Sequence, residues 1–378
     1  MDSLTQAVLG AGIQGALLGR FHGRKALVAG ALLATLPDLD VLIDHGDPIS
    51  GMINHRGFSH SVFVLTALAA LLTWLYRRWR PHPDYGAGRL FLTLWLVLVT
   101  HPLLDAFTSY GTQLWWPLRP IPTAWSSIFI IDPFFTVPLT LVVIAALIAG
   151  NKPRTGPALG IALGWCALYL AASLGIKGFV EGRVKHQLAS EGIHTQAVFS
   201  TPEPFNILLW RVVTRTDDDH YVETISSLLD RQPPEHLRLP LNSGLAWARE
   251  AGPAASPMAG PAHGEDAGTP GAIQAHRAIS PQLAGLQWFT GNWLRYDAID
   301  NHLVVSDLRM GLGTGYYSFR FVIARRNGAG APWVPETPHY WPRNRGTEQL
   351  ESVIRRVWQQ QPPLPLAQWE ALMTSPAH

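Results

Sequence analysis

The sequence predicts an α-helical polytopic membrane domain of about six segments in residues 1–176, followed by a small α+β soluble domain in residues 177–378. Two observations lead to this fold class. Of the 378 residues, 47% are hydrophobic and only 15% are charged, whereas about a quarter of the residues of a soluble protein are charged. The deficit is uneven, because the first half holds long apolar runs and the second half reads as ordinary soluble sequence.

Six apolar runs are candidates for membrane-spanning segments, since a span needs about 20 mainly apolar residues. The last two are the most apolar. The first is short, with small residues at Gly10, Gly15 and Gly19 that favour close helix packing in a bilayer. The second ends in acidic residues. Either of these two runs can therefore be partly buried in the bundle and not fully lipid-facing. The six runs cover residues 4–19, 26–43, 61–76, 90–107, 129–150 and 156–176.

The loops between these runs differ sharply in basic residues. Three loops together hold nine Lys and Arg residues, and the two loops between them hold only Arg56 and Arg119. Cytoplasmic loops have the excess of positive charge. We therefore expect the basic loops in the cytoplasm, and the N-terminus, the other loops and everything after residue 176 outside. The basic loops are residues 20–25, 77–89 and 151–155, and the others are 44–60 and 108–128.

Composition excludes several classes of protein. The net charge of +2 gives no overall basic field, so no nucleic-acid partner is expected. Cys166 is the only cysteine and lies inside an apolar run. It cannot form a disulfide within the chain, and a cysteine-rich zinc site is excluded as well.

A set of Asp and His residues, together with Arg56, lies at the ends of several runs on the side expected to face outward, whereas His22 and His82 lie on the cytoplasmic side. This placement is independent of the loop charges, so the agreement predicts that separate segments converge on one layer. The residues are Asp2 before the first run, Asp38 and Asp40 at the end of the second, His55, Arg56 and His60 before the third, His101 and Asp105 in the fourth, and Asp132 in the fifth.

Carboxylates and imidazoles in this arrangement favour a metal site, because both are ligands of zinc and related divalent ions. His101 and Asp105 are four residues apart and share one helix face. Pro37 favours a helix break, after which Asp38 and Asp40 can both turn inward. Ionisable groups at membrane depth indicate function by default.

Two of the polar residues have a competing interpretation. Asp132 precedes Pro133 and can be the favourable anion at a helix N-terminus. Arg56 can be an interfacial anchor whose side chain reaches water, or a clamp for a phosphate or carboxylate group.

Four motifs arrive in order along the first 150 residues: Met1-Asp-Ser-Leu-Thr5, Leu36-Pro-Asp-Leu-Asp40, His55-Arg-Gly-Phe-Ser-His60-Ser61, and His101-Pro-Leu-Leu-Asp105-Ala-Phe-Thr108-Ser-Tyr-Gly111-Thr112. In combination they resemble the YdjM-like family of bacterial inner-membrane proteins, which are described as predicted metal-dependent hydrolases. That family is thought to be distantly related to zinc-dependent phospholipase C and nuclease P1 type enzymes.

The resemblance implies a metal site, with zinc as the first expectation and manganese as the second. Carried over residue by residue, the ligands are Asp38, Asp40, His55, His60, His101 and Asp105. The chain departs from the family in one place, because Thr5-Gln6 stands where members commonly have Thr-His. If that histidine is a ligand, this chain has lost it.

These observations predict a hydrolase that uses metal-activated water on an ester or phosphodiester at the outer face of the membrane. A lipid or lipid-linked substrate is expected there, with Asp40 or Asp105 as base and Arg56 as the group that neutralises developing charge. Two other classes remain. A transporter usually has polar residues along the midplane of its spans, where this chain has Leu, Ala and Val. A non-catalytic assembly or sensor protein would hold a structural metal.

The second half predicts a small α+β domain. Strand-like runs at 205–214, 221–228, 301–307 and 315–324 are expected to form one antiparallel sheet. An amphipathic helix is expected at 177–194, a helical stretch near 278–287, and one or two helices in 346–375. The Pro/Gly/Ala-rich run at 251–272 is expected to be a loop. Asp307 and Arg309 are expected to form a structural ion pair.

Overall fold

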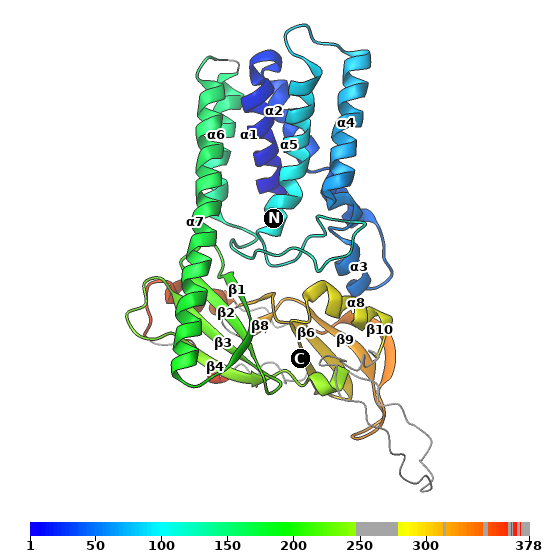
Figure 1. The fold of residues 1–378 in the computed structure, drawn as a ribbon, viewed down its shortest axis with the longest axis vertical. Helices are drawn as coiled ribbons and strands as arrows, with labels where there is room; N and C mark the ends of the chain where they lie inside the picture. The colour runs from blue at the N-terminus through cyan, green and yellow to red at the C-terminus, as the bar shows by residue number, and fades with distance from the viewer. Residues whose placement is uncertain are drawn as a thin grey trace, which may run out of the picture.

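The computed structural model describes residues 1–150, 152–246, 279–312, 315–342 and 347–361, with residues 364, 366–368 and 371. The loop predicted at 251–272 lies outside these residues. Figure 1 shows a helical bundle at one end of the molecule and a sheet-containing region at the other, connected by one long helix.

The bundle contains six helices from the first part of the chain, and α1 contacts four of the others, namely α2, α5, α6 and α7. Three of the helices, α4, α5 and α7, are long and apolar enough to cross a membrane, and α6 is apolar but shorter. The helices are α1 (Ser3–His22), α2 (Arg24–Ala34), α4 (Val62–Trp79), α5 (Ala87–Ala106), α6 (Pro133–Ala149) and α7 (Thr155–Ser190).

The second predicted span does not form a membrane-crossing helix, so six spanning segments are not confirmed. Its helix α2 has 11 residues and is followed by the short 3₁₀ helix η1 (Pro37–Leu42). At 1.5 Å per residue, α2 is about 16 Å long, about half of the 30 Å hydrocarbon core. Pro37 lies at the first position of η1, where its missing N–H is tolerated but would have interrupted a longer α-helix.

Close packing of α1 on α2 depends on glycine, as the sequence predicts. A Cβ atom on Gly10 would lie 2.3 Å from the Cβ of Ala34 and 2.4 Å from the carbonyl oxygen of Gly30. A Cβ on Gly15 would lie 2.9 Å from Leu159 in α7, whereas one on Gly19 would meet nothing within 4 Å. Two of the three small residues are therefore packing positions and the third is not.

The three basic loops lie together at one end of the bundle. They form the turn between α1 and α2, the connection between α4 and α5 and the connection between α6 and α7, all at the top of Figure 1. The opposite end of the bundle faces the sheets. The side of the membrane on which each end lies stays a prediction.

The strands form two four-stranded antiparallel sheets, so the prediction of one sheet is wrong. The expected strands lie two in each sheet, where they pair with each other and with further neighbours. The first sheet has the order β1-β2-β3-β4 and the second β10-β9-β6-β5. The strands are β1 (Thr195–Pro202), β2 (Leu209–Thr216), β3 (His220–Ser227), β4 (Glu235–Pro240), β5 (Leu294–Ile299), β6 (His302–Asp307), β9 (Arg320–Arg325) and β10 (Val334–Tyr340), with β7 (Gly311–Leu312) and β8 (Tyr316–Tyr317) as a separate pair.

Helices link each sheet to the bundle. The last span and the helix expected at 177–194 form one continuous helix, α7, whose Val180 and Val184 pack in a core with Trp210 of β2. The short helix α3 (Pro48–Asn54) packs on α8 (Pro281–Thr290), and Met52 belongs to the core of the second sheet. The second sheet is thereby held directly below the loop that contains the His-Arg-Gly-Phe-Ser-His motif.

Other predicted features of the second half are present. Helix α8 matches the stretch expected near 278–287, and α9 (Thr347–Arg356) with the short η4 (Leu366–Gln368) lies in the expected 346–375. Arg309 Nη2 lies 2.8 Å from Asp307 Oδ2 with both side chains buried, which confirms the structural ion pair.

Candidate metal centre

Four of the predicted ligands converge at the end of the bundle that faces the sheets. Asp38 lies in η1, His60 in the short 3₁₀ helix η2 (Phe58–His60), and His101 and Asp105 near the end of α5. One potential ligand atom from each residue lies within 4.8 Å of those of the other three. His60, His101 and Asp105 are buried, whereas the Asp38 side chain is 23% exposed.

Both histidines direct the same ring nitrogen at the centre of this cluster. The Nδ1 atom of His101 lies 2.6 Å from the carbonyl oxygen of Ala34, and the Nδ1 atom of His60 lies 2.9 Å from Ser59 Oγ. The two Nε2 atoms are 3.2 Å apart. Histidines that bind metals usually donate the other ring N–H to a carbonyl or a polar partner. The Nδ1 contacts of both rings are therefore those expected of metal-binding histidines.

The carboxylates complete the cluster. Asp38 Oδ1 lies 3.2 Å from His101 Nε2, and Asp105 Oδ2 lies 3.3 Å from His60 Nε2. Partial burial raises the pKa of Asp38, but its hydrogen bonds with His101 and His60 outweigh burial and hold that pKa well below the usual range. Asp38 is therefore ionised, as a metal ligand has to be.

The unsatisfied atoms of the site also fit a cation. Asp105 Oδ2 accepts no hydrogen bond, although Arg56 Nε lies 3.2 Å away, and Gln6 Oε1 has no partner among the described residues. Buried oxygens without partners are uncommon and costly. The two imidazole nitrogens and two carboxylates of the cluster match the donors that zinc and related divalent ions prefer.

The other two predicted ligands, Asp40 and His55, lie beside this cluster and pair with each other. His55 Nδ1 is 2.8 Å from Asp40 Oδ1, and Ser59 Oγ donates to the second oxygen of Asp40. Burial raises the pKa of Asp40, but the hydrogen bonds from His55 and Ser59 outweigh it and lower that pKa. The His55 ring centroid is 5.8 Å from that of His60, and the His55 side chain is 25% exposed. Whether the pair also binds metal stays a prediction.

Arg56 faces the interior of the site and is buried, with 4% exposure, so it is not an interfacial anchor. Its Nε atom contacts Asp105, its Nη1 atom donates to Thr108 Oγ1 at 3.2 Å, and its guanidinium lies 4.8 Å from the ring centre of Tyr110. These contacts fix the guanidinium against Asp105.

Several residues that were not among the predicted ligands also contact the site. Gln6 Nε2 donates to Asp105 Oδ1 at 3.1 Å, and the amino group of Met1 also bonds this oxygen. Ser59 supports both His60 and Asp40, and its place between two predicted ligands was a usable signal. Tyr110 bridges Arg56 to Phe289 in the sheet region, and no pattern in the sequence indicates this contact.

The remaining polar residues at span ends are helix caps. Asp132 is buried and accepts hydrogen bonds from Phe134 N, Phe135 N and the Tyr169 hydroxyl at the start of α6. Asp2 caps α1 through Thr5 N. The interpretation of Asp132 as the residue at a helix N-terminus is thereby confirmed.

Comparison with known proteins gives one family model and two relatives. Residues 1–180 match the family model described as YdjM inner membrane protein. The uncharacterized protein YfhP of Bacillus subtilis is 30% identical over 236 residues, which are 59% of this chain and 67% of that protein. The inner membrane protein YbcI of Escherichia coli is 37% identical over 95 residues, 24% of this chain and 52% of that protein.

No solved structure matches this chain. The range matched by the family model, residues 1–180, includes Asp38, His60, His101 and Asp105. The four motifs, the apolar helices and these matches together show that the chain belongs to the YdjM inner membrane protein family.

Proposed function

We propose that this protein is a membrane-bound, metal-dependent hydrolase that cleaves an ester or phosphodiester in a lipid or lipid-linked substrate. The observation that supports this most directly is the cluster of two imidazole nitrogens and two carboxylates within 4.8 Å of one another. Its place at the end of a bundle of apolar helices favours a substrate whose reacting bond lies at the membrane surface.

In this proposal Asp38, His60, His101 and Asp105 hold the metal, with zinc preferred and manganese second. A divalent ion bound there would polarise the scissile group and lower the pKa of a water molecule towards neutrality. Arg56 acts as a positioning residue, because its guanidinium contacts Asp105 and is already engaged by Thr108 and Tyr110. Its contacts keep Asp105 ionised and oriented.

Asp40 and His55 are the proposed proton-transfer pair. Asp40 orients the His55 ring through Nδ1, in the way a carboxylate orients a catalytic histidine elsewhere. The Nε2 atom of His55 then remains to take up or release a proton. Because the side chain is partly exposed and lies next to His60, it is accessible to a reacting group in the cluster.

The test separates metal binding from proton transfer in the full-length protein. Metal content is measured by mass spectrometry, and hydrolysis with phospholipid vesicles and a chromogenic phosphodiester, for wild type, His101→Ala and His55→Ala. We expect His101→Ala to lose metal and turnover together. His55→Ala should retain the metal and lose turnover by roughly 10²–10⁴-fold. His82→Ala, at the opposite end of the bundle, is the matched control.

Turnover that persists in a metal-free His101→Ala protein would overturn the proposal. A second candidate is a metal-stabilised assembly or sensor protein, which the near-complete burial of His60, His101 and Asp105 favours. It predicts that His101→Ala loses metal and thermal stability, with no hydrolysis of either substrate by the metal-loaded wild type.

A further inference from the structure

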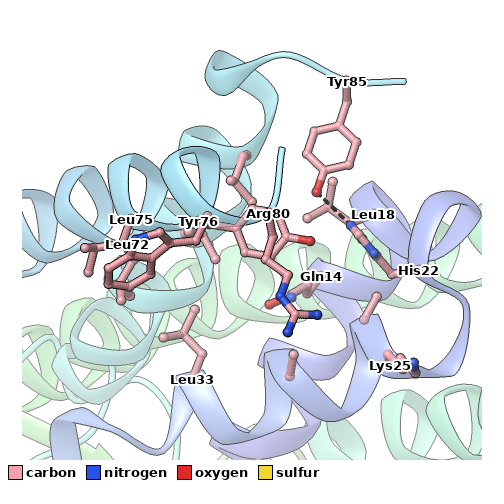
Figure 2. Close-up of a pocket in the computed structure, with 15 residues that line it drawn as sticks. Gln14, Leu18, His22, Lys25, Leu33, Leu72, Leu75, Tyr76, Arg80 and Tyr85 are labelled. Atoms are coloured by element: carbon pink, nitrogen blue, oxygen red, sulfur yellow. Dashed lines mark hydrogen bonds between the residues drawn. The ribbon is translucent and has the colours of Figure 1, made fainter. Parts of the chain in front are cut away.

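A large pocket lies along the helices at the basic end of the bundle, and its lining extends along α2 as far as Leu33. Its volume is about 600 Å³, and it is partly open, lying between α1 and α2 on one side and α4 and α5 on the other. The wall is mainly leucine, from Leu18 and Leu33 to Leu72 and Leu75 (Figure 2). Pockets of about 300–1,000 Å³ typically hold small organic ligands.

The rim of this cavity is positively charged. Lys25 at the start of α2 and Arg80 at the end of α4 both line it, and no Asp or Glu does. Neither side chain has an ion-pair partner in the part of the chain that the structure describes. Figure 2 shows the Arg80 side chain extending into the pocket. An anionic group at the rim would therefore meet two cations with no competing carboxylate.

A polar side chain without a partner lies deeper in the cavity. Gln14 is 7% exposed, lines the pocket, and its Oε1 atom has no hydrogen-bond partner among the described residues. Burial of an unpaired amide costs about 1–3 kcal/mol. A ligand that carries polar groups between an anionic head and an apolar tail would bring those groups to this amide and also cover the leucine wall.

The connection between α4 and α5 closes one end of the cavity. Tyr85 folds back so that its hydroxyl lies 2.7 Å from His22 Nε2, the dashed contact in Figure 2. Trp79, next to Arg80, is 72% exposed, and tryptophan is enriched where membrane meets water. These residues place the rim at the depth of lipid headgroups.

We propose that this cavity binds one anionic glycerophospholipid of the surrounding bilayer, with its phosphate between Lys25 and Arg80 and an acyl chain along the leucine wall. Basic pockets between membrane helices bind anionic headgroups in this way. A free phosphate would satisfy the cations but leave the apolar wall uncovered, and a zwitterionic lipid would place its own cation at the basic rim.

The experiment uses full-length protein in a non-ionic detergent, titrated with phosphatidylglycerol, phosphatidylcholine or inorganic phosphate. Bound lipid is counted by native mass spectrometry. We expect wild type to prefer phosphatidylglycerol, and Lys25→Gln/Arg80→Gln to bind it roughly tenfold to thirtyfold more weakly. Arg78→Gln/Arg154→Gln removes the same charge from the same end outside the cavity, and should bind within about twofold of wild type.

A third variant, Ala29→Trp, fills the cavity without changing its charge and should also reduce bound phosphatidylglycerol. This variant decides the matter if the double charge variant fails to fold. Equal binding of the two lipids by wild type, or equal losses in the two charge variants, would overturn the proposal. Binding of inorganic phosphate as tight as that of lipid would overturn it as well.

Discussion

The rings of His60 and His101 meet edge to face, with ring centres 5.0 Å and Nε2 atoms 3.2 Å apart. Because the Nδ1 atom of each ring already has an outer partner, the facing nitrogens are the ones left to share a proton or a cation. A divalent ion at this point would satisfy both, together with Asp38 and Asp105.

Ser59→Ala should weaken metal binding without removing a ligand. Its hydroxyl lies against His60 Nδ1 and donates to Asp40, and loss of such outer partners typically costs about 10–100-fold in metal affinity. Competition with a chelator measures the change. Ser61→Ala is the control, because Ser61 Oγ donates to the Trp116 carbonyl and caps α4 away from the cluster. Equal affinities in the two variants would contradict the proposed ligand set.

Substitution of Gln6 should change metal affinity in two opposite directions. Gln6→His places an imidazole beside Asp105 and should tighten binding, while Gln6→Ala removes the hydrogen bond to that carboxylate and should weaken binding roughly tenfold. Both are measured by the same chelator competition. If Gln6→His weakens binding as much as Gln6→Ala, the imidazole does not reach the metal.

Gly10→Val should uncouple α2 from α1 and thereby disturb the metal centre. The added side chain would overlap Ala34 and Gly30, and Ala34 holds the His101 ring through its carbonyl. Overpacking of this kind typically costs about 1–3 kcal/mol, so we expect lower thermal stability and a lower metal content. Gly19→Val, on the same helix with no atom within 4 Å, should behave as wild type.

Glu223→Ala should strongly destabilise the sheet region. Glu223 and Arg211 are both fully buried in a direct ion pair, and the Tyr317 hydroxyl donates to the same carboxylate. Removal of one partner leaves an uncompensated buried charge, which costs about 3–5 kcal/mol of unfolding free energy. Chemical denaturation measures it, and metal content should not change in the folded protein.

The double variant Arg211→Met/Glu223→Leu is the matched control for this prediction. It removes both charges at once, and well-packed apolar replacements of a buried ion pair are often neutral or stabilising. The double variant should therefore be more stable than Glu223→Ala. The opposite order would mean that the pair holds a geometry that apolar side chains cannot replace.

The helices of the membrane half were largely predictable from the sequence, because each apolar run and each basic loop can be recognised without knowing which segments contact each other. Apolar runs and basic loops follow from the bilayer itself, and the polar residues that cluster at one end of the bundle were identified by their place at span ends. The length of α2 was not evident, because apolar residues continue beyond Ala34 although the helix does not.

The spacing of residues in the sequence did not predict which of the candidate ligands enter the cluster. Asp38 and Asp40 are two residues apart in one 3₁₀ helix, yet only Asp38 enters the four-residue cluster. His60 likewise enters the cluster while His55 does not, although their ring centroids are only 5.8 Å apart. The prediction placed all four expected strands in one sheet. The sequences of β4 and β10 show little alternation of apolar and polar residues, so these two strands and their pairing were not predicted.

The unbroken helix α7 connects the bundle rigidly with the first sheet. With 36 residues at 1.5 Å each it is about 54 Å long, and Lys177 near its middle donates to the Ser200 carbonyl of β1. As a continuous helix, α7 sets the distance between the first sheet and the membrane-spanning part of the bundle. A tilt of α7 in the bilayer would therefore also move the first sheet.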